Sequence, residues 1–318
     1  MDIEKIKNKY NKKNAIIVYS GELAIETVLI NEKIDKGDYV VIPNNVCYRI
    51  LNAIIRRKAI PIIVRPENEF IITAKDINKI LENYNTKCIL AVHQFGLNVN
   101  IDKIRSECKN NEIIIEDIAQ GWDVFSEKKI GNSSDYIVSS FGKGKPLDFG
   151  IGGIVLTNND NIIKNMDYNN IQSRYSEKEL IPYIMPHNVN INFTELINKA
   201  DDKKKHNVKL ARICSKEIKN KKINFYKVKN VEECYWERIP IWTEDINIFN
   251  QMIAIAKKMR VSYEPYHNKL LEELPLLKNK KYIYINLSTK KRLFMLLKTE
   301  ELRERIIRNF IKEINEIK

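Results

Sequence analysis

The sequence contains little glycine, proline or cysteine, and it has no long uninterrupted apolar run. Its 318 residues include 10 glycines and 9 prolines, which excludes collagen-like and linker-dominated chains. The five cysteines are widely spaced and form no CxxC pair, so they favour free thiols in a reducing compartment over a zinc module or a disulfide framework. The opening MDIEKIKNKY has no apolar segment behind its charges, and no apolar run reaches membrane-spanning length. We expect a cytoplasmic protein with no metal site and no membrane contact.

Positive charge exceeds negative charge: 54 Lys and Arg residues stand against 41 Asp and Glu residues, a formal net charge of +13. Such a balance can indicate nucleic acid, an anionic membrane surface or anionic small molecules as partners. The lysines form short clusters, however, and aromatic residues are not interleaved with them as a stacking platform for bases requires. Solvated helix faces explain the charge better, so we expect no nucleic-acid partner.

Short apolar segments alternate with helix-period segments from Ala15 to about Thr157. The apolar segments are rich in Ile and Val on both faces, as strands buried between two layers of helices are. This alternation predicts βαβ units, that is, an α/β fold with a mostly parallel seven-stranded sheet between helices. The expected strands are Ala15–Tyr19, Tyr39–Ile42, Pro61–Val64, Cys88–Val92, Glu112–Ile115, Tyr136–Ser140 and Gly153–Leu156. The expected helices are Glu22–Ile30, Val46–Lys58, Ala74–Tyr84 and Ile101–Asn110.

The pattern changes after Asn158 to a smaller α+β arrangement. A long charged helix is predicted from Thr194 to about Lys219, with Glu195 near its start. Two strands near Ile223–Val228 and Tyr235–Ile241 and two helices near Ile246–Met259 and Glu300–Ile317 are expected to follow. We predict a large domain over residues 1–200 and a small C-terminal α+β domain over residues 201–318.

Three predicted strands end in residues suited to chemistry, at the edge where open α/β sheets bind ligands. Asp117 follows an apolar strand, where a carboxylate is costly without a cationic or donor partner. The next strand opens into a glycine-rich loop that carries Lys143 and Lys145, and such a loop can hold an amine in a concave site. The first strand ends at Ser20-Gly21 before a helix, whose N-terminus can bind phosphate. Each feature alone is more often a cap, an ion pair or a surface turn; together they indicate a site for pyridoxal 5′-phosphate (PLP).

Several motifs, in order, resemble those of the DegT/DnrJ/EryC1/StrS aminotransferases, fold-type-I PLP enzymes that aminate keto-sugars attached to nucleotides. The resemblance runs from about Asn14 to Ala200 and more faintly to the C-terminus. The segments that carry it are LAVHQFG (Leu90–Gly96), IEDIAQ (Ile115–Gln120), SFGKGK (Ser140–Lys145), GIGG (Gly150–Gly153), NINFTE (Asn190–Glu195) and YEPYH (Tyr263–His267). The resemblance implies a fold-type-I PLP-transferase.

The resemblance also implies roles for individual residues. Lys145, rather than Lys143, aligns with the lysine that forms the Schiff base with PLP and acts as general base. Asp117 aligns with the residue that pairs with the pyridine nitrogen. Asn190 aligns with the Asn that reaches the phosphate of the neighbouring subunit's cofactor, which implies a homodimer. The implied cofactor-binding residues are Gly21, Glu22, Cys47, Asp117, Gln120, Ser140, Lys145 and Asn190.

Four positions depart from the family pattern. Glu22 stands where the family has Thr or Ser, and a carboxylate repels a nearby phosphate. Cys47 replaces the aromatic ring that covers the cofactor, Asn192 replaces an Arg, and Trp122 replaces a His. The chain also begins at what is usually the first large-domain helix, so we expect a shortened N-terminus and an altered substrate pocket. The candidate substrate residues are His93, Trp122, His187 and His267.

The leading hypothesis is a PLP-dependent aminotransferase that acts on a nucleotide-linked keto-deoxy sugar for a surface glycan or glycoconjugate, with L-glutamate as the implied donor. Lys145, in place of the His that family dehydrases carry, favours transamination. A second hypothesis keeps PLP but changes the keto acceptor. A third is a degenerate, non-catalytic homologue that acts as a partner subunit. Glu22, Cys47 and Asn192 favour this third hypothesis, and the intact Asp117 and Lys145 oppose it.

Overall fold

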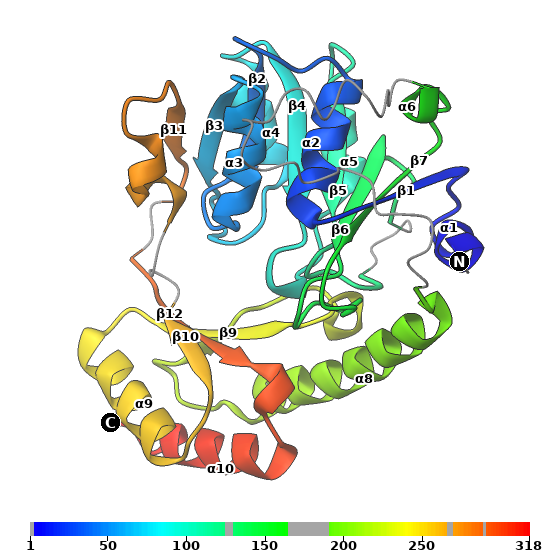
Figure 1. The fold of residues 1–318 in the computed structure, drawn as a ribbon. Coiled ribbons are helices and arrows are strands. Elements are labelled where there is room, and N and C mark those ends of the chain that lie inside the picture. The colour runs from blue at the N-terminus through cyan, green and yellow to red at the C-terminus, as the bar shows by residue number, and fades with distance from the viewer. Residues whose placement is uncertain (1–2, 125–129, 165–190, 266–269, 289–290) are drawn as a thin grey trace.

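In the computed structural model, the chain forms two β-sheets with helices packed around them (Figure 1). The structure describes residues 3–124, 130–164, 191–265, 270–288 and 291–318. Over these residues the larger sheet has eight strands in the order β1-β7-β6-β5-β4-β2-β3-β11. Neighbouring strands are parallel from β6 to β11, whereas β7 is antiparallel to both β1 and β6. The strands are β1 (Asn14–Val18), β2 (Tyr39–Pro43), β3 (Ile60–Arg65), β4 (Thr86–Val92), β5 (Ile113–Asp117), β6 (Tyr136–Ser140), β7 (Gly153–Thr157) and β11 (Ile283–Asn286).

Two layers of helices bury the larger sheet because its central strands carry apolar side chains on both faces. In β2, for example, Val40 belongs to the core on one face and Val41 to the core on the other. Helices α2 (Gly21–Asn31) and α3 (Tyr48–Arg56) contribute to the first core, and α4 (Ala74–Leu81) and α5 (Ile101–Glu107) contribute to the second. This arrangement confirms the predicted α/β class.

The seven expected strands of this sheet all form, and each end lies within two residues of its expected position. The eighth strand, β11, was not predicted. It pairs in parallel with the outer side of β3, with Ile283 opposite Ile62. Because β11 is a short edge strand whose side chains are only half-buried or exposed, it carries no strong apolar pattern. This strand comes from the sequence range assigned to the small domain, and the boundary at residue 200 stays a prediction.

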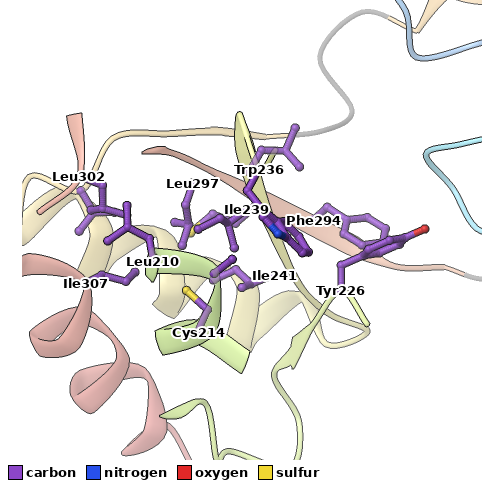
Figure 2. Packing of buried hydrophobic residues seen from close by; sticks show 14 of the residues in the cluster. Leu210, Cys214, Tyr226, Trp236, Ile239, Ile241, Phe294, Leu297, Leu302 and Ile307 are labelled. Atoms are coloured by element: carbon purple, nitrogen blue, oxygen red, sulfur yellow. The ribbon is translucent and has the colours of Figure 1, made fainter. Parts of the chain in front are cut away.

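The smaller sheet is antiparallel, in the order β10-β12-β9-β8, and packs with three helices around one apolar core. Figure 2 shows part of this core, where Trp236, Ile239 and Phe294 from the sheet region lie near Leu210 and Ile307 from the helices. The elements are α8 (Phe193–Glu217), β8 (Asn224–Phe225), β9 (Arg238–Thr243), α9 (Ile246–Lys258), β10 (Tyr263–Pro265), β12 (Leu293–Lys298) and α10 (Glu304–Asn315). Strand β8 is shorter than expected, and β10 and β12 were not predicted.

Short helices complete the described part of the chain. The α-helices are α1 (Ile3–Lys9) and α6 (Asn161–Lys164). The 3-10 helices are η1 (Gln94–Gly96), η2 (Val231–Glu233), η3 (Leu271–Glu273), η4 (Pro275–Leu277) and η5 (Thr299–Glu301).

Gly96 lies where the segment before β9 packs against the end of β4. The amide of Tyr235 donates a hydrogen bond to the Gly96 carbonyl at 2.7 Å. Gly96 has a φ of +78°, and a Cβ added there would lie 2.7 Å from the Trp236 nitrogen. Both the left-handed backbone and the close approach therefore require glycine.

We predict that Gly96→Ala destabilises the protein more than Gly37→Ala does. Gly37 also has a positive φ of +93°, but an added Cβ would meet nothing within 4 Å. Both variants bear the left-handed strain of roughly 1–2 kcal/mol, and Gly96→Ala adds an overpacking cost of about 1–3 kcal/mol. Urea unfolding of the two variants measures the difference, and equal losses in the free energy of unfolding would contradict the close packing.

Candidate active site

A pocket of about 530 Å³ opens at the carboxyl ends of the strands of the larger sheet. Six of the eight predicted cofactor-binding residues line it, and they come from segments far apart in the sequence. These residues are Gly21, Glu22, Cys47, Asp117, Ser140 and Lys145. The volume falls within the usual range for small-molecule sites. The structure therefore brings most of the predicted site together.

The N-terminus of α2 forms one wall of this pocket. Ser20 caps the helix by accepting a hydrogen bond from the Leu23 amide at 3.2 Å. Gly21 follows, and a Cβ there would lie 2.9 Å from the Cβ of Ser140. Gly153 is equally confined, because a Cβ there would lie 2.6 Å from the Ser20 carbonyl oxygen. The glycines thus keep the helix start open as a cradle for an anion, with the positive end of the helix dipole toward it.

The carboxylate of Glu22, one of the four positions that depart from the family pattern, is neutralised by two arginines from α3. Arg49 lies 3.3 Å from it, and Arg56 forms a second, shorter ion pair. Arg56 also pairs with Glu26 at 2.7 Å. Burial lowers the pKa of Arg56, but the bonds to Glu26 and Glu22 outweigh burial and raise it overall. The Glu22 side chain is therefore bound to α3, and its repulsion of an anion in the cradle is offset.

Asp117 lies at the floor of the pocket and is 5% exposed. One of its oxygens accepts a hydrogen bond from the Ala119 amide at 2.8 Å. Burial raises the pKa of Asp117, while the Ala119 hydrogen bond and the charge of Lys145 act to lower it. A cationic N–H group in the pocket would complete the pairing of this carboxylate, so the residue fits the protonated ring nitrogen of PLP.

The neighbouring carboxylate, Glu116, is already satisfied by the protein. One of its oxygens accepts from the Gly131 amide at 2.8 Å and the Ser134 hydroxyl at 2.7 Å. The other lies 3.0 Å from Nε2 of His93. Because Nδ1 of His93 accepts from the Val99 amide at 3.1 Å, Nε2 carries the proton and donates to Glu116. His93 is therefore a buried structural residue below the site and does not line the pocket.

Lys143 and Lys145 both line the pocket from the loop after β6. The loop is closed by an isolated bridge between Gly142 and Gly150 and by the amide of Phe149, which donates to the Phe141 carbonyl at 3.0 Å. Lys145 is the lysine whose charge acts on Asp117. That electrostatic link agrees with the motif alignment in favouring Lys145 as the functional amine.

Two other predicted residues lie away from the pocket wall. The side-chain oxygen of Gln120 accepts a hydrogen bond from the Phe95 amide at 2.9 Å. Trp122 is fully buried, and its indole N–H donates to Asp201 at 2.7 Å. Trp122 is buried in the core beside α8 and does not line the pocket, so the structure does not support its predicted contact with the substrate. Asn192, which replaces the family Arg, caps α8 by accepting from the Glu195 amide at 3.1 Å.

Three predicted residues, His187, Asn190 and His267, lie outside the described residues. Arg49 is a pocket-lining residue that sequence reasoning missed. Its only sequence signal is its place just after the carboxyl end of β2, in the first turn of α3. Within the described ranges, no group of three or more His, Cys, Asp or Glu side chains could hold a metal ion. No helix among the same residues is long and apolar enough to cross a membrane.

The fold is that of the fold-type-I PLP-dependent transferases. A model of the DegT/DnrJ/EryC1/StrS aminotransferase family matches residues 4–295, and the chain belongs to this family. Similar solved structures share the fold. A family member from Brucella abortus superposes with a TM-score of 0.77 at 18% identity, over 98% of this chain and 87% of that chain. DesV from S. venezuelae, in complex with a ketimine intermediate, superposes with a TM-score of 0.78 at 17% identity, over 98% and 87%.

Similar curated proteins include GDP-perosamine synthases. The one from Escherichia coli O157:H7 is 32% identical over 163 residues, which cover 49% of this chain and 44% of the relative. The one from Vibrio cholerae is 30% identical over 154 residues, which cover 48% and 42%. The matched region thus spans less than half the length of these relatives.

We predict that Arg49→Met weakens the binding of inorganic phosphate to the ligand-free protein by roughly fivefold, about 1 kcal/mol, because a partly exposed cation at the cradle is lost. Glu22→Gln should strengthen binding, since it removes the competing carboxylate. Isothermal titration measures both effects. Arg212→Met is the matched control, because Arg212 pairs with Glu232 and does not line the pocket. An Arg49 variant with unchanged affinity would show that the anion does not reach this side chain.

Proposed function

We propose that this protein is a PLP-dependent aminotransferase. The observation that carries the proposal is the convergence in one pocket of a buried carboxylate, a loop lysine and a capped helix N-terminus. These are the groups that PLP requires for its ring nitrogen, its aldehyde carbon and its phosphate. The membership of the chain in an aminotransferase family supports the same activity.

Each residue of the pocket would have its own role in binding the cofactor or in catalysis. The amides of Gly21 and Glu22 and the hydroxyl of Ser140 would hold the phosphate, with Arg49 adding positive charge. Asp117 would keep a proton on the ring nitrogen. Bound in this way, PLP supplies an electron sink for the negative charge that develops on the amino donor. Lys145 would anchor the cofactor and, once its amine is released, carry the proton between donor and cofactor.

We infer that the amino acceptor is a nucleotide-linked keto-deoxy sugar, and that the product serves a surface glycan or glycoconjugate. The GDP-perosamine synthases among the relatives support this class of substrate. Arg49 and Lys143 at the pocket suit an anionic nucleotide. L-glutamate is the proposed donor. The described cysteines are all free thiols, which agrees with the reducing cytoplasm as the proposed location.

A homodimer is part of the proposal. Three large apolar side chains are exposed at or beside the pocket: Tyr48 (50%), Phe149 (38%) and Ile151 (51%). Tyr48 and Phe149 are chain neighbours of the pocket-lining residues Cys47 and Gly150, and Ile151 lines the pocket itself. Apolar side chains exposed together favour an interface, and a second copy would cover them while bringing its own Asn190 toward this site.

Borohydride reduction of the protein with added PLP should place a stable pyridoxyl group on Lys145. Peptide mapping by mass spectrometry identifies the modified residue. Lys145→Ala should abolish the specific adduct, whereas Lys143→Ala, two residues away on the same loop, should retain it. Label scattered over surface lysines, or concentrated on Lys143, would overturn the assignment of Lys145.

Asp117→Asn should retain PLP but slow the half-reaction with L-glutamate by roughly 100-fold or more, because a neutral amide cannot hold the proton on the ring nitrogen. Stopped-flow absorbance of the cofactor measures this rate. Because burial raises the pKa of Asp117 in the folded protein, ionisation of this carboxyl group at pH 8 lowers the free energy of unfolding. The ligand-free variant should therefore unfold no more easily than the wild type at pH 8. A wild-type rate in this variant would remove Asp117 from the catalytic residues.

A further inference from the structure

A second pocket, of about 390 Å³, lies at the junction of the two sheets. It shares no lining residue with the candidate active site. Its walls come from residues 68–71 after β3, residues 97–103 between β4 and the first turn of α5, and residues 226–234 between β8 and β9. The volume is that of a small-molecule site, and a ligand there would contact segments of both sheets.

The buried side chains that line this pocket are apolar or uncharged. Leu97 and Cys234 are at most 1% exposed, and Tyr226 is 9% exposed. Burial raises the pKa of the Cys234 thiol to about 12, so this group is neutral. The hydrogen bond from the Tyr235 amide to the Gly96 carbonyl joins the residues next to Cys234 and Leu97. The buried part of the pocket is therefore fixed by the contact between the two sheets.

The charged side chains that line the same pocket are predominantly positive. Lys103 comes from α5, and Lys227 and Lys229 come from the segment after β8. Over the part of the chain that the structure describes, none of these three lysines forms an ion pair. Glu233 is the one carboxyl group in the lining. Three positive charges thus face one negative charge, and the excess favours an anion between the lysines.

Two asparagines in the lining add hydrogen-bond donors. The side-chain oxygen of Asn68 accepts from the amides of Phe70 and Ile71 at 3.1 and 3.0 Å. The side-chain oxygen of Asn100 accepts from the Lys103 amide at 3.0 Å. Neither side-chain nitrogen has a hydrogen-bond partner among the described residues. The unused groups of these two side chains are therefore N–H donors, which match the acceptor oxygens of an anion.

We propose that this pocket binds a small organic phosphate. The ammonium groups of Lys103, Lys227 and Lys229 hold the phosphate, which supplies several acceptor oxygens and nearly two negative charges. The apolar or aromatic body of the ligand lies on Tyr226 and Leu97. The ligand joins α5 of the larger sheet to the β8–β9 segment of the smaller sheet. This site is separate from the PLP pocket and does not depend on the proposed function.

The test measures lysine reactivity in the folded protein, with phenyl phosphate as the probe. Trace acetylation with isotope-labelled acetic anhydride, followed by mass spectrometry, gives the rate for each lysine as the probe is added. The rates of Lys103, Lys227 and Lys229 should fall together by about threefold or more at saturation, because a bound phosphate shields each amine and keeps it charged. Lys221 and Lys222, exposed residues outside the pocket, should keep their rates.

Two double variants separate this site from the general positive charge. In the variant with Lys227→Gln and Lys229→Gln, half-protection of Lys103 should need about a tenfold higher probe concentration, because two of three cations are lost. The variant with Lys221→Gln and Lys222→Gln loses the same charge outside the pocket and should change that concentration less than twofold. All four lysines are exposed, so both variants should retain the wild-type melting temperature.

Inorganic phosphate is the second probe and tests the apolar part of the proposal. It should need a roughly fivefold higher concentration than phenyl phosphate for the same protection, since it has no ring to bury. Equal potency of the two probes would overturn the assignment to an organic phosphate.

Three other results would overturn the site itself. These are protection spread evenly over exposed lysines, equal losses in the two double variants, and protection confined to Lys143 and Lys145. The last result would place the phosphate in the candidate active site alone. The proposed function is judged separately, by the borohydride trapping of PLP on Lys145.

Discussion

The site depends on the cost of burying a carboxylate without a partner. Glu116 and Asp117 are consecutive residues of β5, so their side chains point to opposite faces of a sheet that is covered on both sides. Glu116 is closed inside the protein by bonds to Gly131, Ser134 and His93. Asp117 receives one backbone N–H and otherwise faces the pocket. The protein therefore satisfies one carboxylate internally and directs the other into the pocket, which the N-terminus of α2 and the loop of Lys143 and Lys145 also line.

The structure shows how the residues that depart from the family pattern are accommodated. Glu22 is one of three positions that favour a degenerate homologue in the sequence, because a carboxylate at an anion site opposes binding. In the structure its charge is offset by ion pairs with Arg49 and Arg56 of α3. Cys47 also lines the pocket, and the exposed ring of Tyr48 is adjacent in sequence. These positions are consistent with a remodelled pocket, so they no longer favour loss of function over a changed substrate.

The sequence predicted the larger sheet well because buried parallel strands leave continuous runs of Ile and Val, as in Ile113–Asp117. It predicted the edge strand β11 poorly, since an edge strand is half-exposed and its pairing with β3 depends on a contact over 200 residues away in the chain. The same limit applies to the site. Asp117 and Lys145 carry local motifs, whereas Arg49 has no signal until folding brings it to the pocket. Trp122 looked like a pocket residue from its motif position, yet its ring is buried against α8.

The junction between the two sheets fixes the segment that enters β9. The segment from Tyr235 to Glu237 is fixed against the larger sheet by the hydrogen bond from Tyr235 to Gly96, and the approach leaves no room for a side chain at Gly96. One residue beyond this close contact, the chain enters β9, whose pairing with β12 and β8 holds it in the smaller sheet. The backbone on either side of Glu237 is thus fixed, on one side by the larger sheet and on the other by the smaller sheet. The same junction brings α8 to the loop that carries Lys145, because Lys203 donates a hydrogen bond to the Gly144 carbonyl at 3.3 Å.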